Sequence, residues 1–119
     1  PTLVVFWLGM QCPHCVEQLQ ALDQKAKDFA DLGIDVLAIG NLPAGDATFG
    51  FPLLHDADLA TFRAWHCFDE FEAMPLHGTF VIDRGQVRWQ DVGAAPFVDF
   101  AWLRGECQRL LHLHAVGPK

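Results

Sequence analysis

Residues 6–15 read Phe-Trp-Leu-Gly-Met-Gln-Cys-Pro-His-Cys, and this stretch decides both the fold and the chemistry that the sequence predicts. It joins an apolar run to two cysteines that are separated by two residues, at the start of a helical pattern. Cysteines at this spacing lie one turn apart once a helix begins at the first, so their sulfurs can form a reversible disulfide. We therefore predict a redox site at Cys12 and Cys15.

The residues between and after the cysteines favour a reactive thiolate. Pro13 suits the first helical position, because its fixed φ matches a helix and its missing N–H would have had no partner there. Cys12 then falls at the N-cap, where free backbone N–H groups and the helix dipole lower a thiol pKa from roughly 8.5. A protonated His14 would strengthen this effect. Cys15, inside the first turn, is the predicted resolving partner.

Composition limits the kind of protein and its partners. A chain of 119 residues with 51% apolar residues can bury one core, which argues against disorder. A net charge of −7 without a basic cluster argues against nucleic acid and anionic membranes as partners. No apolar run approaches the ~18 residues of a membrane span. We expect one soluble domain, residues 1–119, cut from a longer chain and with a slight preference for the cytoplasm over the periplasm.

Hydrophobic patterning predicts a βαβ unit around the cysteines. Residues 3–8 form a continuous apolar run of strand length, and apolar positions recur at helical spacing from Pro13 to about Leu32. Gly33 is a typical residue just after a helix, and residues 34–39 are a second buried strand. Strand, helix and strand at this spacing pair the strands in parallel with a right-handed connection. The cysteines then lie at the carboxyl end of a central strand, where open α/β sheets place their sites.

The second half of the chain completes the sheet. After a loop over residues 41–52, Asp56 is expected to cap a short helix. Residues 78–83 and 86–92 read as strands joined by a turn at Arg84-Gly85, which makes an antiparallel hairpin, and residues 97–113 read as a closing helix. We predict an α/β fold with a central mixed sheet of about four strands, flanked by helices.

Three stretches carry a resemblance to a known family. They are Cys-Pro-His-Cys-Val-Glu-Gln-Leu at 12–19, Phe-Pro-Leu-Leu-His-Asp at 51–56 and His-Gly-Thr-Phe-Val-Ile-Asp at 77–83. With its element order, the chain resembles thioredoxin-fold redoxins. Within them it is similar to peroxiredoxins of the alkyl hydroperoxide reductase and thiol-specific antioxidant (AhpC/TSA) type and to thioredoxin-like oxidoreductases. The resemblance implies a thioredoxin-like fold, antioxidant redox activity, and a cis-proline at Pro75 whose loop lies against the disulfide.

The chain departs from these families at several positions. Peroxiredoxins place a Thr three residues before the peroxidatic Cys. This position is Cys12 if Cys15 is the peroxidatic residue and Gly9 if Cys12 is, so neither register has the Thr. Their active-site Arg matches His77, a weaker and pH-dependent hydrogen-bond donor. Carboxylates of thioredoxins and related oxidoreductases correspond to Phe6 and Gln18, which cannot accept a proton. Proton transfer would therefore fall to Glu17, His14 or water.

These observations leave three functional hypotheses. In the first, the chain is a thiol-disulfide oxidoreductase: Cys12 attacks a protein or small-molecule disulfide and Cys15 resolves the mixed disulfide. In the second, it is a peroxidase in which a thiolate, Cys15 by family register, is oxidised by a hydroperoxide and condenses with its neighbour. Both enzymes need a thiol reductant and no cofactor. In the third, it is a non-catalytic redox-sensing or protein-binding module of a larger protein.

Structural roles compete with catalysis at the cysteines and at His77. Cys12 and Cys15 could be half of a zinc site or a structural disulfide, but His66, Cys67 and His77 supply no second Cys-x-x-Cys, so we predict no metal. His77 could be a hydrogen-bonded residue at the entry of a strand. The remaining cysteines, Cys67 and Cys107, lie on apolar stretches and are predicted to be small buried hydrophobes.

Overall fold

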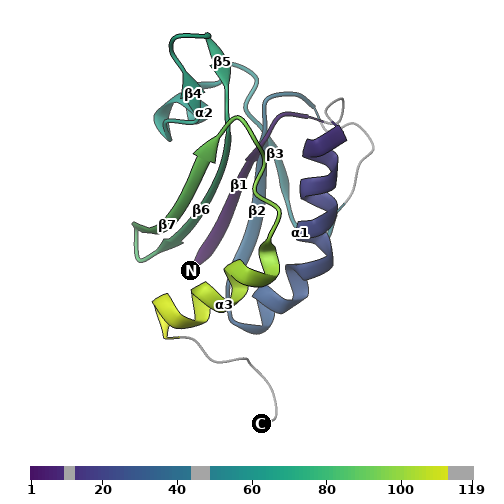
Figure 1. Cartoon of the computed structure of the whole chain (residues 1–119), viewed down its shortest axis with the longest axis vertical. Coiled ribbons are helices and arrows are strands. Elements are labelled where there is room, and N and C mark those ends of the chain that lie inside the picture. The colour runs from purple at the N-terminus through teal and green to yellow at the C-terminus, as the bar shows by residue number, and fades with distance from the viewer. Residues whose placement is uncertain (10–12, 44–48, 113–119) are drawn as a thin grey trace.

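A computed structural model describes residues 1–9, 13–43 and 49–112, with the backbone alone for residues 13–15. A five-stranded sheet forms its centre, in the order β3-β2-β1-β6-β7 (Figure 1). In chain order the elements are β1 (Thr2–Trp7), α1 (Pro13–Asp31), β2 (Asp35–Gly40), β3 (Leu53–His55), α2 (Ala60–Ala64), β4 (Phe68–Asp69), β5 (Met74–Pro75), β6 (His77–Asp83), β7 (Gln86–Gly93) and α3 (Phe100–Leu111).

The sheet is mixed, as predicted. β1 pairs in parallel with β2, which pairs in parallel with β3. On its other side β1 pairs antiparallel with β6, and β6 pairs antiparallel with β7. The sheet has one strand more than the approximate four expected, because β3 has three residues and no clear periodicity. No helix in the described part of the chain is long and apolar enough to span a bilayer.

Helix α1 begins at Pro13 and ends where Gly33 was predicted to stop it. Gly33 has φ +78°, a conformation that glycine adopts without steric cost. Its N–H donates to the carbonyl of Ala30 at 2.9 Å, and the N–H of Ile34 donates to the carbonyl of Phe29 at 3.0 Å. These two bonds form a Schellman motif, which turns the chain directly into β2.

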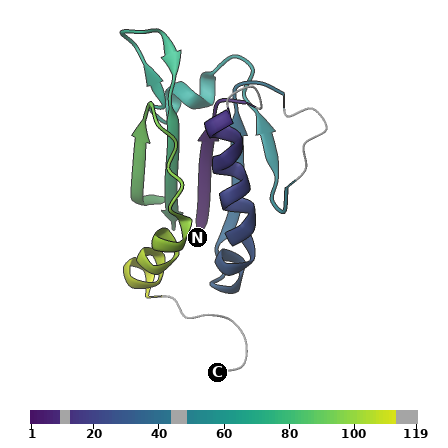
Figure 2. The same ribbon diagram turned by 45° about the vertical axis from the view of Figure 1, so that its right-hand side comes forward.

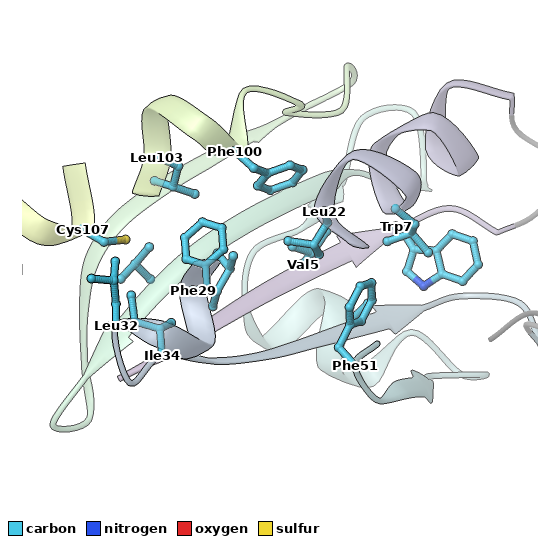
Figure 3. Close-up of a cluster of buried hydrophobic side chains, with 14 residues drawn as sticks. Val5, Trp7, Leu22, Phe29, Leu32, Ile34, Phe51, Phe100, Leu103 and Cys107 are labelled. Carbon is cyan, nitrogen blue, oxygen red and sulfur yellow. The ribbon is translucent and has the colours of Figure 1, made fainter. Parts of the chain in front are cut away.

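Successive side chains along each strand point to opposite faces of the sheet, and both faces are apolar. Leu3, Val5 and Trp7 of β1 point to one face. Figure 3 shows the side chains that cover it, which include Leu22 and Phe29 of α1 and Phe100, Leu103 and Cys107 of α3. Val4 and Phe6 point to the other face, where the only helix in the described chain is the five-residue α2. Figure 2 shows α1 and α3 on the same side of the sheet. The second face is therefore covered much less than the first.

The short helix α2 and the hairpin turn follow their sequence signals. The Asp56 carboxylate accepts a hydrogen bond of 2.8 Å from the N–H of Phe62, whose ring packs edge-to-face on Phe6 at 5.0 Å. Arg84 and Gly85 have φ values of +54° and +76°, as a type I′ turn requires. The prediction for the turn is confirmed. Asp56 does bond to an N–H group in the first turn of α2, but the N-cap position is held by Leu59, whose side chain makes no capping bond.

The expected cis-proline is not found. The described chain contains no cis peptide bond, so the bond between Met74 and Pro75 is trans. Pro75 lies in a two-residue strand opposite Phe68, and the N–H of Leu76 donates to the carbonyl of Cys67 at 2.9 Å. An extended ladder suits the trans form, which X–Pro bonds already favour.

Candidate functional site

Three neighbouring strands of the sheet have an end at the same edge, which we call the site edge. We define it by Trp7, Gly40 and His77. Trp7 and Gly40 are the last residues of the parallel strands β1 and β2, and His77 is the first residue of the antiparallel β6. α1 begins at the same edge, at Pro13, six residues after the end of β1 at Trp7 (Figures 1 and 2). The backbone thus carries the start of the cysteine-bearing helix to the carboxyl end of a central strand, as the sequence predicted.

The register of the strands places the residues of the site edge side by side, in a row that crosses the sheet. Trp7 is opposite Gly40 in the β1–β2 ladder, and His77 is opposite Gly93 in the β6–β7 ladder. Phe6 pairs with Gly78, so Trp7 and His77 are the next positions in that antiparallel register. Residues that pair in this way point to the same face. Trp7 and His77 therefore both lie on the face that α1 covers.

Gly40 makes room for the indole of Trp7. A Cβ at position 40 would lie 2.7 Å from Trp7 Nε1, which is closer than such atoms pack, and 3.1 Å from Cε2, which is tight. Trp7 is 1% exposed, and its Nε1 has no hydrogen-bond partner among the described residues. The indole is thus a rigid, buried part of the site edge.

His77 is buried at 3% exposure, and burial lowers the pKa of its imidazole from the ordinary value of 6.5. The neutral form therefore dominates at neutral pH, since desolvation disfavours the charged form. A neutral imidazole has one N–H that can donate a hydrogen bond, but it lacks the permanent charge of an arginine. Thr79, two residues further on the same face, is 1% exposed, and its Oγ1 has no partner in the described chain.

Gln18 connects α1 to the segment before α3. Its side chain is completely buried, and Nε2 donates a hydrogen bond of 3.0 Å to the carbonyl oxygen of Phe97. The other amide atom, Oε1, has no partner among the described residues. Gln18 lies three residues after Cys15, and helical side chains lean toward the preceding turn. Its amide therefore belongs to the surroundings of the first turn of α1.

The predicted site residues fall into two groups. Cys12 lies outside the described residues, and Pro13, His14 and Cys15 belong to the first turn of α1, where only their backbone is described. Of the other candidates, Glu17 is exposed on α1, Pro75 is half-buried in β5, and His77 is buried at the site edge. The start of α1 at Pro13 gives a helix N-terminus at the cysteine pair, and such a terminus stabilises a thiolate.

Cys67 and Cys107 are not part of this site. Both side chains are fully buried, Cys67 beneath α2 and Cys107 between α3 and α1. Burial raises the pKa of Cys67 to about 12, and burial with the nearby Glu106 carboxylate raises that of Cys107 to about 11. Both were predicted to be structural, and their packing fits that role. Within the described ranges, no group of three or more His, Cys, Asp and Glu side chains could hold a metal ion.

Sequence reasoning missed two features of the site edge. Gln18 was noted only as a position that lacks a carboxylate. Gly40, which lies between the strand predicted at 34–39 and the loop predicted at 41–52, was given no role. The helical spacing from Cys15 to Gln18 could have identified the first. The clash between Trp7 and a side chain at position 40 has no sequence signal, because it depends on the register of two strands.

Comparisons with known proteins agree with this geometry. The model of the AhpC/TSA family matches residues 1–90, which contain the cysteine pair, the site edge and most of β7. A comparison with curated proteins gave no match.

Solved structures share the fold at low sequence identity. AhpC of Enterococcus faecalis is 15% identical with a TM-score of 0.76, over 93% of this chain and 75% of that chain. Thioredoxin peroxidase I of Plasmodium yoelii is 18% identical with a TM-score of 0.77, over 93% and 72%. Peroxidoxin BcpB of Mycobacterium tuberculosis is 21% identical with a TM-score of 0.76, over 91% and 77%. The α/β fold is therefore thioredoxin-like, as the sequence predicted.

Proposed function

We propose that this chain, which belongs to the AhpC/TSA family, is a thiol peroxidase that reduces hydroperoxides with its two neighbouring cysteines. The family match carries the proposal, because it spans both the cysteine pair and the strand that begins at His77. It favours the peroxidase hypothesis over general thiol-disulfide exchange. The helix start at Pro13 supports it further, since a thiolate is the species that attacks a peroxide.

The proposed first step takes place at Cys15, whose spacing matches the peroxidatic position of the family. Its thiolate sulfur attacks one oxygen of the hydroperoxide, the O–O bond breaks, and the other oxygen leaves as an alcohol or water after taking a proton. Cys15 becomes a sulfenic acid. The neutral imidazole of His77 would donate a hydrogen bond to the peroxide, and His14, Glu17 or water would supply the proton.

The second step uses Cys12 as the resolving residue. Its sulfur attacks the sulfenic sulfur of Cys15, an S–S bond forms, and the hydroxyl leaves as water. Two electrons from an external thiol reductant then return the disulfide to the dithiol. Pro13 would hold the two cysteines close by fixing the start of the helix between them.

The two single-cysteine variants test the proposal. Cys15→Ser should abolish consumption of H2O2 in stopped-flow measurements. Cys12→Ser should still be oxidised once, and its sulfenic acid should be trapped by dimedone because no partner resolves it. Cys107→Ser serves as the control and should react at the wild-type rate, since Cys107 is buried away from the site. Loss of the peroxide reaction in Cys12→Ser with retention in Cys15→Ser would reverse the assigned roles.

Thiol-disulfide exchange remains the second candidate because of one observation, the Cys-x-x-Cys spacing itself. In that reaction Cys12 is the attacking thiol, so Cys15→Ser should trap mixed disulfides with a protein substrate. Reduction of a protein disulfide faster than reduction of H2O2 would favour it. If the reduced chain reacts with neither, the remaining hypothesis is a redox-sensing or binding module.

A further inference from the structure

The hairpin of β4 and β5 exposes an apolar tip that the redox site does not use. Phe71 in the turn is 101% exposed, and Met74, the first residue of β5, is 51% exposed. Two large apolar side chains exposed in this way in one short hairpin are unusual. Figure 1 shows the hairpin projecting beyond the end of the sheet. Single exposed apolar residues are common on protein surfaces. Two of them at a protruding tip are suited to bind in a pocket of another molecule.

The tip is held in a fixed shape. The Asp69 carboxylate accepts hydrogen bonds from the N–H groups of Phe71 at 2.9 Å and Glu72 at 3.1 Å. At the base of the hairpin, Phe68 pairs with Pro75, and the Arg63 guanidinium lies 4.4 Å from the centre of the Phe68 ring. A preorganised tip loses little conformational freedom on binding.

The face of the sheet on which α2 lies contains an apolar pocket that could accept an apolar side chain. A cavity of about 450 Å³ is lined by Ala64, Trp65, His66, Phe80, Ile82, Gly85, Val87 and Gln90. Most of these residues are apolar, and Val87 is 49% exposed at its rim. We call this cavity the α2-face pocket. It lies between α2 and the β6–β7 hairpin, on the face that α1 and α3 do not cover.

The charges at the two surfaces are complementary. Glu70 and Glu72 flank Phe71 at the tip, next to Asp69. Of the described residues that line the α2-face pocket, none is acidic, and Arg84 stands beside Gly85 at one end with a side chain that is 93% exposed. Asp83 is 4.0 Å from Arg84 and offsets part of its charge. Because the whole chain has a net charge of −7, two copies repel each other overall, and a local match of opposite charges favours this relative orientation.

A hairpin tip does not reach the pocket of its own chain. The tip extends past the beginning of β6, whereas the pocket extends along β6 toward Gly85 at the other end of that strand. We propose that two copies of this chain form a reversible dimer in which Phe71 of each copy binds in the α2-face pocket of the other. The arrangement is isologous, so each dimer has two equal tip contacts. Association through two such tip contacts should be weak, so the fraction of dimer should rise with protein concentration.

Sedimentation velocity over a concentration series tests this dimer. The wild-type chain should show a monomer–dimer equilibrium. Phe71→Glu at the tip and Val87→Glu at the pocket should each raise the dissociation constant at least about tenfold, as loss of a central apolar anchor does. Val98→Glu is the matched control: Val98 is 51% exposed but lies before α3, and its substitution should leave the equilibrium unchanged.

A mixture of the two variants gives the decisive result. A Phe71→Glu molecule keeps an intact pocket and a Val87→Glu molecule keeps an intact tip, so the mixed pair regains one of the two contacts. It should associate more tightly than either variant alone and more weakly than the wild-type chain. The proposal is overturned if the wild-type chain stays monomeric or grows beyond dimers, if Val98→Glu weakens association as much as Val87→Glu, or if mixing the variants restores nothing.

Discussion

The side-chain amide of Gln18 donates its hydrogen bond to the carbonyl oxygen of Phe97, a residue 79 positions later in the chain. This bond joins the first turns of α1 to the segment that leads into α3. The Phe97 ring in turn packs against Trp89 at 5.1 Å and Phe100 at 5.6 Å. This hydrogen bond therefore links the position of the cysteine-bearing helix to the aromatic packing around α3.

Replacement of Gln18 should weaken the fold. Gln18→Leu keeps an apolar stem but leaves the Phe97 carbonyl without its donor, and we expect a loss of about 1–2 kcal/mol in the free energy of unfolding. Urea denaturation followed by tryptophan fluorescence measures it. Gln20→Leu makes the same change at an exposed position of the same helix and should stay within about 0.5 kcal/mol of wild type. Equal effects of the two substitutions would show that the buried bond contributes nothing.

His77 should make the stability depend on pH in a defined direction. Burial lowers the pKa of the folded imidazole below 6.5, while the unfolded chain titrates near that ordinary value. Between the two pKa values the unfolded state binds more protons, so the free energy of unfolding falls as the pH drops below about 6.5. Above that pH the contribution of His77 is constant.

Urea denaturation at pH 8 and pH 5 tests this sign. The difference in unfolding free energy between the two pH values should be smaller in His77→Asn than in the wild-type chain. His55→Asn is the control, because His55 is exposed on β3 and its surroundings change little on unfolding. If the difference in unfolding free energy between pH 8 and pH 5 is the same in His77→Asn as in the wild type, the expected role of the buried imidazole is contradicted.

The four thiols should divide into two classes toward alkylating reagents. With pKa values of about 12 and about 11, Cys67 and Cys107 are ionised at pH 8 only to about 1 part in 10⁴ and 10³, against roughly a quarter for an ordinary thiol. Iodoacetamide at pH 8 should label Cys12 and Cys15 in the folded, reduced chain, and all four cysteines in guanidinium. Peptide mass spectrometry locates the labels. Labelling of Cys67 or Cys107 before unfolding would contradict their packing.

The sequence predicted those elements whose signals are local. The helix start at Pro13, its end at Gly33 and the turn at Arg84-Gly85 each depend on the backbone preference of one or two residues, and all three are confirmed. The buried strands β1, β2 and β6 were found from their apolar runs. The strands β3, β4 and β5 have two or three residues each, too few to show a period, and were not predicted.

The site was less predictable because its parts meet through tertiary structure. His77 and Trp7 lie in one row only because β1 and β6 pair with a particular register, which no local pattern fixes. The cis-proline was inferred from the resemblance alone, and the ladder between Pro75 and Phe68 favours the trans form instead. Trp102 of α3 is 48% exposed, and its ring contacts the rings of Trp89 and Phe97.

Gly40, opposite Trp7, and Gly93, opposite His77, should respond in opposite ways to the same substitution. A methyl group at Gly40 would lie 2.7 Å from the buried Trp7 indole, so Gly40→Ala should cost about 1–3 kcal/mol and change the tryptophan emission. A methyl group at Gly93 meets nothing within 4 Å, so Gly93→Ala should be neutral or stabilise by a few tenths of a kcal/mol. Guanidinium denaturation of both variants measures the difference. Similar losses at the two positions would mean that loss of glycine from a strand, and not the contact with Trp7, determines the effect.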